Sequence, residues 1–262
     1  MADHLAANES ERRTLLGKII AVVSGTGGTG KTSFTACVSL ALAAMGHTTL
    51  ALDCDITLRN LDLALGLSDS AAMDFSDVLE GRCTLTEAAV PHRKYPKLSL
   101  LAAPLAPVGA RFSLSAMQTL AQEIRERYDY CLMDAPAGLG QGFQLATAVA
   151  DSVVVVTTTD PAALRDAQRT VMELRRFPSG QVHLVVNRVQ KKMLKALHTT
   201  IDDAMDTAGL PLLGVIPEDG DIPLALNRGI PLRDINYYGQ RAYENIAKRI
   251  TGQRAPLLRA RW

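Results

Sequence analysis

A glycine-rich segment, GTGGTGKT at residues 25–32, contains the residue types that bind phosphate. It follows an apolar, strand-like run, precedes a helix-like run, and fits the pattern G-x-x-x-x-G-K-[ST]. The glycines allow a tight turn in which successive backbone N–H groups face a phosphate, at the positive end of the following helix. Lys31 would then reach the β- and γ-phosphates, and the Thr32 hydroxyl would be a ligand for Mg²⁺. The segment therefore predicts a nucleoside triphosphate site. Its expected contact residues are Gly25, Thr26, Gly27, Gly28, Thr29, Gly30, Lys31, Thr32 and Ser33.

Three carboxylates, Asp53, Asp55 and Asp134, stand at or just after the ends of apolar runs further along the chain. Because open α/β sheets bind ligands at the carboxyl ends of their strands, we expect all three beside the phosphate loop. Thr32, Asp53 and Asp134 are the candidate Mg²⁺ ligands. The backbone N–H of Gly138 is expected to approach the γ-phosphate. For Asp53 alone, a second interpretation is a carboxylate that caps the turn at its own strand end.

Seven apolar runs alternate with helix-like stretches. The runs occupy residues 18–23, 48–53, 97–103, 128–134, 152–158, 181–187 and 212–217. Most of them lack polar alternation, which indicates strands that are covered on both faces. The pattern predicts an α/β fold of the P-loop NTPase type, a mostly parallel sheet flanked by helices on both faces in a single domain. Gly46 is expected to end the helix after the phosphate loop, and Asp160 with Pro161 to begin another.

The composition argues against several classes of protein. The chain has 28 basic and 27 acidic residues, so no global field attracts it to nucleic acid or to an anionic membrane. Its four cysteines form no CxxC pair, which favours buried thiols in a reducing cytoplasm, and its five histidines show no ligand spacing. Apolar stretches long enough for a membrane span or a signal core are missing from the sequence. We therefore expect a cytoplasmic protein whose only metal is Mg²⁺.

Several segments of the sequence resemble the motifs of the MinD/ParA family of deviant-Walker P-loop ATPases and follow in the same order along the chain. The resemblance covers roughly residues 17–256. DCDITLRNLDLALGL resembles the first switch region, DAPAGLG the Walker B motif with the second switch, and GVIPEDGDIPLALNRGIPL the loop near the base. The resemblance implies ATP or ADP as ligand and names Lys31, Asp55 and Asp134 as catalytic residues. In this scheme Asp55 positions the attacking water and Asp134 serves Mg²⁺.

The same resemblance implies that adenine is recognised by Asn187 and by the backbone around Pro217, Glu218 and Asp219. The amide of Asn187 offers the donor and acceptor that an adenine edge needs. Its alternative interpretation is an amide that ends a strand by bonding its own backbone.

The phosphate loop departs from the family pattern at Thr26. Family members have a second lysine at this place, which crosses to the phosphates of the partner subunit in a nucleotide-sandwich dimer. Threonine carries no charge, and a missing cation of this kind can cost on the order of 10³–10⁵ in rate. The sequence therefore leaves two functions open, a slow ATPase and a nucleotide-binding scaffold without turnover. Arg59 could substitute for the lysine, but we favour a solvated or structural role for it.

The sequence divides into an N-terminal extension (residues 1–16), a P-loop ATPase domain of the MinD/ParA type (17–252) and a short basic C-terminal tail (253–262). The tail carries Leu257, Leu258 and Trp262, which could contact lipid at the inner face of the membrane. However, Pro256 prevents the preceding helix from continuing. One short segment rarely anchors a protein, so we favour a frayed tail over a weak membrane contact.

The resemblance implies an ATP-dependent homodimer that acts as a switch in placing the division septum or another cellular structure. A division or positioning regulator would bind near the first switch region, where Leu61, Leu63 and Leu65 are either core or contact residues. The alternative is a ParA-like chromosome-partition factor or a flagellar-number regulator. For that alternative the basic residues that could contact DNA are Arg188, Lys191, Lys192 and Lys195. Charge runs are usually solvated helix faces, so DNA is not the favoured partner.

Overall fold

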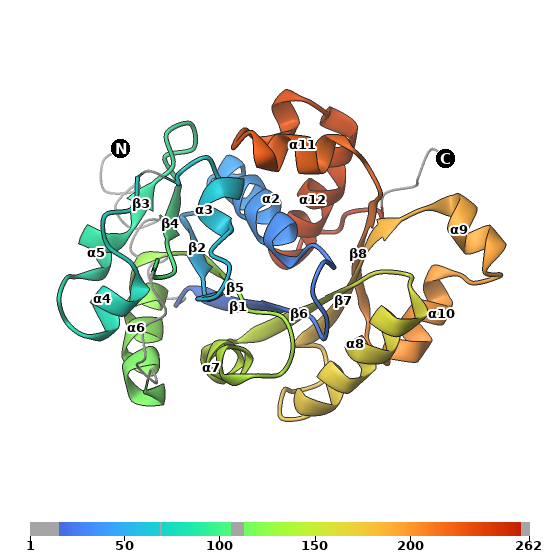
Figure 1. The fold of residues 1–262 in the computed structure, drawn as a ribbon, viewed down its shortest axis with the longest axis horizontal. Coiled ribbons are helices and arrows are strands. Elements are labelled where there is room, and N and C mark those ends of the chain that lie inside the picture. Colours follow the sequence, from blue (N-terminus) through green and yellow to red (C-terminus); the bar gives the residue numbers. More distant parts are fainter. Residues whose placement is uncertain (1–15, 69, 106–112, 258–262) are drawn as a thin grey trace, which may run out of the picture.

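The computed structural model describes residues 16–68, 70–105 and 113–257, and within them one eight-stranded sheet forms the centre of the molecule (Figure 1). The strand order is β3-β4-β2-β5-β1-β6-β7-β8. The strands are β1 (Lys18–Val23), β2 (Thr49–Asp53), β3 (Val90–Pro91), β4 (Leu98–Leu101), β5 (Tyr130–Asp134), β6 (Ser152–Thr157), β7 (Val182–Val189) and β8 (Leu212–Pro217). Every pair is parallel except β3 with β4. The prediction of a mostly parallel sheet is confirmed.

Each of the seven apolar runs overlaps one of these strands, although β7 extends two residues past its predicted end, to Val189, and β3 was not predicted. It has two residues and lies at the edge of the sheet, where Pro91 is tolerated because an edge strand need not donate on both sides. A segment this short shows no alternation that sequence analysis could detect.

Helices cover both faces of the sheet, as predicted. They are α2 (Lys31–Ala44), α3 (Leu61–Ala64), α4 (Phe75–Leu79), α5 (Leu85–Ala88), α6 (Leu114–Arg127), α7 (Gln141–Val149), α8 (Pro161–Glu173), α9 (Lys191–Ala196), α10 (Ile201–Ala208), α11 (Asp221–Asn227), the 3₁₀ helix η1 (Leu232–Asp234) and α12 (Tyr237–Ile250). One core layer joins the sheet to α6, α7, α8 and α10, and two clusters on the other face join it to α2, α3, α11 and α12 (Figure 1). The central strand β1 alternates Ile19 and Ala21 toward the first layer with Ile20 and Val22 toward the second.

Helix boundaries follow the local signals. Gly46, with φ 95°, follows the C-cap of α2, and Gly252, with φ 80°, follows the end of α12. Asp160 caps α8, since its carboxylate accepts from the backbone N–H groups of Ala162 (2.8 Å) and Ala163 (3.3 Å), and Pro161 occupies the first turn. Both predicted helix boundaries are confirmed.

Part of the predicted organisation lies outside the described residues, namely residues 1–15 of the extension and Leu258 and Trp262 of the tail. Residues 253–257 follow α12 without a regular element, and the carbonyl of Ala255 accepts from Arg249 Nε (2.9 Å). In the described part of the chain, no helix is both long and apolar enough to span a bilayer.

Candidate nucleotide-binding site

The glycine-rich segment forms a loop from the end of β1 to the start of α2, at the carboxyl edge of the sheet. Gly28 and Gly30 have φ values of 76° and 91°, which favour glycine. A Cβ at Gly30 would lie 2.2 Å from Asn187 Nδ2, and one at Gly25 would lie 2.5 Å from the carbonyl oxygen of Asp166 on α8. No side chain caps the N-terminus of α2, so its first backbone N–H groups are open to an anion.

Lys31, the first residue of α2, is buried where the loop meets the helix. Its Nζ donates to the hydroxyl of Ser24 (2.8 Å), a residue that the sequence motif does not include. Burial lowers the pKa of Lys31, and the negative charges of Asp134 and Asp55 act in the opposite direction. Two of the three candidate carboxylates are therefore close enough to the Lys31 ammonium to affect its pKa.

Thr32 and Asp134 are in direct contact. Thr32 Oγ1 donates to Asp134 Oδ2 (2.6 Å), and Thr35 Oγ1, one turn further along α2, donates to Oδ1 (3.4 Å). Asp134 ends β5 and is buried, and burial raises its pKa to about 6, against the hydrogen bond from Thr32 and the charge of Lys31. A buried carboxylate beside a threonine hydroxyl is suited to a small cation.

Asp53, at the end of β2, pairs in register with Asp134 on the neighbouring strand β5. Burial, followed by the charge of Asp134, raises its pKa to about 7. Its two carboxylate oxygens accept the backbone N–H groups of Asp55 (2.9 Å) and Leu61 (3.2 Å). Asp53 therefore caps the loop that follows its own strand, as the second interpretation predicted, and it lies next to Asp134. Its role as a ligand of Mg²⁺ stays a prediction.

Asp55 is held by the turn that follows it. Its Oδ1 accepts the hydroxyl of Thr57 (2.5 Å), the N–H of Thr57 (3.0 Å) and the N–H of Leu58 (3.2 Å). Arg59 has a φ of 41° and donates from Nε to the buried carboxylate of Asp62 (2.9 Å). Arg59 thus makes a structural contact of the kind that we favoured for it.

The hydroxyl and carboxylate oxygens around Thr32 fit Mg²⁺, which prefers oxygen ligands. Among the described residues, no three His, Cys, Asp or Glu side chains form a cluster that could hold a metal ion by themselves. Mg²⁺ usually keeps water and phosphate oxygens among its ligands, so Thr32, Asp53 and Asp134 could hold it together with a nucleotide.

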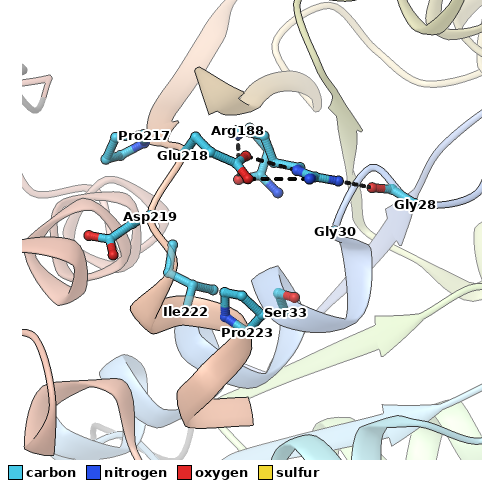
Figure 2. A pocket seen from close by; sticks show the side chains of 10 residues that line it. Gly28, Gly30, Ser33, Arg188, Pro217, Glu218, Asp219, Ile222 and Pro223 are labelled. Carbon is cyan, nitrogen blue, oxygen red and sulfur yellow. Dashed lines mark hydrogen bonds and ion pairs between the residues drawn. The ribbon is translucent and has the colours of Figure 1, made fainter. Parts of the chain in front are cut away.

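A cavity of about 200 Å³ adjoins the loop and joins residues far apart in the sequence (Figure 2). Its lining residues are Gly28, Gly30, Ser33, Asn187, Arg188, Pro217, Glu218, Asp219, Ile222 and Pro223. All four residues that the resemblance assigned to adenine are in this set. The ends of β7 and β8 therefore form a candidate base pocket beside the phosphate loop.

Asn187 connects this pocket to the phosphate loop. It is buried, its Nδ2 donates to the carbonyl of Thr29 (2.8 Å), and its Oδ1 accepts the backbone N–H of Arg188 (2.9 Å). These two bonds fix the orientation of the amide, with Nδ2 toward Thr29 and Oδ1 toward the N–H of Arg188. The bond from the Arg188 N–H is the local backbone bond that the alternative interpretation expected. The bond to Thr29 is a second contact, which forms only when the chain folds.

Arg188 lies at the rim of the pocket, a position that the sequence did not predict (Figure 2). Its Nε and Nη2 donate to the carboxylate of Glu218 (2.8 and 3.2 Å), and Nη1 donates to the carbonyl of Gly28 (3.4 Å). Lys191, Lys192 and Lys195 are exposed on α9, and the preference for a solvated face over a DNA contact stays a prediction.

The position of the loop defines the class of protein: between a strand and a helix, at the carboxyl edge of a mostly parallel sheet, it is the phosphate loop of a P-loop nucleoside triphosphatase. Residues 17–184 match the family model described as an AAA domain. The septum site-determining protein MinD of Synechocystis sp. is 37% identical over 249 residues, which are 93% of this chain and 92% of that protein. The MinD of Bacillus subtilis is 36% identical over 92% of each chain.

Two solved structures extend the comparison. The MinC:MinD cell division protein complex of Aquifex aeolicus matches with a TM-score of 0.85 and 33% identity, covering 92% of this chain and 98% of that chain. The septum site-determining protein MinD of Pyrococcus horikoshii, complexed with Mg-ADP, matches with a TM-score of 0.78 and 29% identity, covering 90% and 96%. The chain belongs to the MinD-type ATPases of the ParA family. The resemblance seen in the sequence is confirmed.

Proposed function

We propose that this P-loop ATPase is an ATP-dependent dimerisation switch that acts in placing the division septum. The names of its relatives support the cellular role. The observation that carries the biochemical proposal is the contact between Thr32 and Asp134 beside the buried ammonium of Lys31, since these groups serve the terminal phosphates and Mg²⁺. The protein would act in the cytoplasm, with at most a weak contact between its tail and the membrane.

The residues divide the work of hydrolysis. Backbone N–H groups of residues 25–33 and the Lys31 ammonium hold the phosphates, and Thr32, Asp53 and Asp134 hold Mg²⁺. When bound, Mg²⁺ would neutralise charge on the phosphates. Asp55 would orient the attacking water, because its Oδ1 is held by three donors from Thr57 and Leu58, which restricts the rotation of the carboxylate.

The N–H of Gly138 is expected to bind the γ-phosphate but donates here to the carbonyl of Ser24 (3.1 Å). It would have to exchange this partner for the nucleotide. The second switch region, which contains Gly138, would therefore move when ATP replaces ADP.

Adenine fits the orientation of Asn187. Since one N–H of its amide is bound to Thr29 and its oxygen accepts from Arg188, the groups left for a ligand are one N–H and one lone pair. Adenine offers an amino donor and a ring acceptor side by side, whereas guanine offers two acceptors on the same edge. The backbone of Pro217, Glu218 and Asp219 would contact the base from the other wall of the cavity.

We propose that the partners are a second copy of the chain and a regulator protein. The Aquifex aeolicus neighbour was solved as a complex of MinC with MinD, which supports a protein partner of this kind. The first switch region offers a surface: Leu61 and Leu65 are buried, while Leu63 is 54% and Leu58 67% exposed.

One specific observation favours a second function. Thr26 has no charge, so the chain could bind nucleotide as a scaffold and turn it over very slowly. The carbonyl of Thr26 accepts the Ser24 hydroxyl (2.6 Å), which stabilises the loop without supplying a cation.

Calorimetry with ATP and Mg²⁺, combined with phosphate release, tests the proposal. We expect that the wild-type protein binds ATP and releases phosphate slowly, and that Lys31→Ala releases none. Binding without release would support the scaffold. Failure of the folded wild-type protein to bind ATP would refute both functions.

A further inference from the structure

Ser24 lies between β1 and the phosphate loop and is 1% exposed. Its hydroxyl makes two hydrogen bonds: it accepts from Lys31 Nζ (2.8 Å) and donates to the carbonyl of Thr26 (2.6 Å). Its backbone carbonyl accepts the N–H of Gly138 (3.1 Å). One residue outside the motif thus contacts the loop, its lysine and the second switch region.

The direction of these bonds determines what the hydroxyl can do. Because Ser24 donates its only proton to Thr26, a lone pair is left for Lys31. An ammonium group has three protons, so two of them are available for phosphate oxygens. A hydroxyl also leaves the positive charge of Lys31 uncompensated, whereas a carboxylate in the same place would neutralise it and compete with the phosphate.

The position of Lys31 makes this bond important. Lysine has a long side chain with high rotamer entropy, and a binding site that already restricts it loses less entropy when the ligand arrives. Lys31 is 8% exposed, so its ammonium group has few alternative positions in which water could solvate it.

We propose that Ser24 is a positioning residue for nucleotide binding, whose hydroxyl holds the Lys31 ammonium in the phosphate loop before ATP arrives. The inference rests on the proposed function. It implies that the energetic effect of Ser24 passes through Lys31 to the β- and γ-phosphates and leaves the base pocket unaffected.

The first test is Ser24→Ala, studied by calorimetry with ATP, ADP and AMP in the presence of Mg²⁺. A hydrogen bond to a charged group is strong enough that we expect roughly tenfold weaker binding of ATP. Binding of AMP, which lacks the phosphates that Lys31 contacts, should be unchanged. Ser24→Thr retains a hydroxyl and should restore most of the ATP affinity.

Ser39→Ala is the matched control. Ser39 lies on α2, is fully buried, and its hydroxyl has no hydrogen-bond partner among the described residues. Its removal deletes the same atom from the same region and should leave ATP binding unchanged. Thermal unfolding of each variant reports whether the fold is retained.

A double-mutant cycle with Lys31→Ala separates the inference from the proposed function. If Ser24 acts through Lys31, Ser24→Ala should have no further effect in the Lys31→Ala background. Additive losses, or an equal loss for AMP and ATP, would overturn the positioning role. If Lys31→Ala alone binds ATP as the wild type does, the proposed phosphate site itself is wrong.

Discussion

At the scale of single residues, the two buried carboxylates Asp53 and Asp134 dominate the electrostatics of the site. They lie in register on neighbouring strands, and burial raises the pKa of Asp134 to about 6 and that of Asp53 to about 7. In the unfolded chain both would titrate near 3.8. The folded protein without ligand therefore binds protons more tightly than the unfolded chain between these values.

We predict that the nucleotide-free protein loses stability as the pH rises from about 4 to about 7, the window set by these two pKa values. Asp134→Asn removes one of the charges and keeps the shape of the side chain. It should raise the thermal midpoint at pH 8 and change it little at pH 4, where Asp134 is already protonated. Thermal unfolding across this pH range, without Mg²⁺ or nucleotide, measures the effect. Equal shifts at both pH values would show that the charge of Asp134 is not responsible.

The residue scale is also where sequence analysis had least to work with. The phosphate-loop motif and the strand-end carboxylates were predicted as candidates because their spacing or position carries a pattern. Ser24, Thr57 and the pocket position of Arg188 were missed, because each depends on a contact with a partner that only the fold determines. A polar residue directly after an apolar strand and before the glycine loop is the one signal that could have pointed to Ser24.

At the scale of elements, the long strands were predictable because each is an apolar run, and α2, α8 and α12 were predictable because Gly46, Asp160 with Pro161, and Gly252 mark their ends. The segment between β2 and β4 was not: α3, α4, α5 and β3 have between two and five residues each. Elements this short form through tertiary packing and local caps, such as the capping boxes that begin α4 at Asp74 and α5 at Thr84, rather than through periodicity.

Asn187, on β7, bonds to the phosphate loop and lines the candidate base pocket, so a substitution at this position tests how the base is recognised. Asn187→Ala removes the donor to Thr29 and the groups that face the base. We predict weaker binding of ATP and a preference for ATP over GTP that falls by roughly tenfold or more, since a bidentate amide contact discriminates bases by about 1–3 kcal/mol. Competition of ATP and GTP for a fluorescent nucleotide measures this ratio.

The control for this experiment is Gln190→Ala, a change just after β7 and outside the lining of the candidate base pocket, which should leave the ratio as in the wild type. An unchanged ratio in Asn187→Ala would mean that the base is read by the backbone of the β8 end instead.

At the scale of the whole molecule, the sheet order explains why the site lies where it does. β1 is central, with β5 on one side and β6 on the other. The strand order therefore reverses direction at β1, and such a reversal leaves a crevice at the carboxyl edge of the sheet. The loop after β1, the carboxylates after β2 and β5, and the pocket at the ends of β7 and β8 all open onto this edge. A second copy that covers the same edge would approach both nucleotides at once.

The lysine missing at position 26 would act across the interface of the proposed dimer, so its test belongs to the assembled molecule. Thr26→Lys supplies the cation that the family places here, and we predict that it raises ATP turnover by a factor of roughly ten to a thousand, short of the 10³–10⁵ of a positioned arginine finger. Because the lysine would act on the phosphates of the partner subunit, the gain should depend on protein concentration and appear only where size-exclusion chromatography with ATP shows a dimer. Thr26→Met matches the length without the charge and should give no gain, and Thr26→Lys combined with Lys31→Ala should be inactive. A gain that is independent of concentration would place the new charge in its own subunit, and no gain in a dimer that binds ATP would show that Thr26 does not limit the rate.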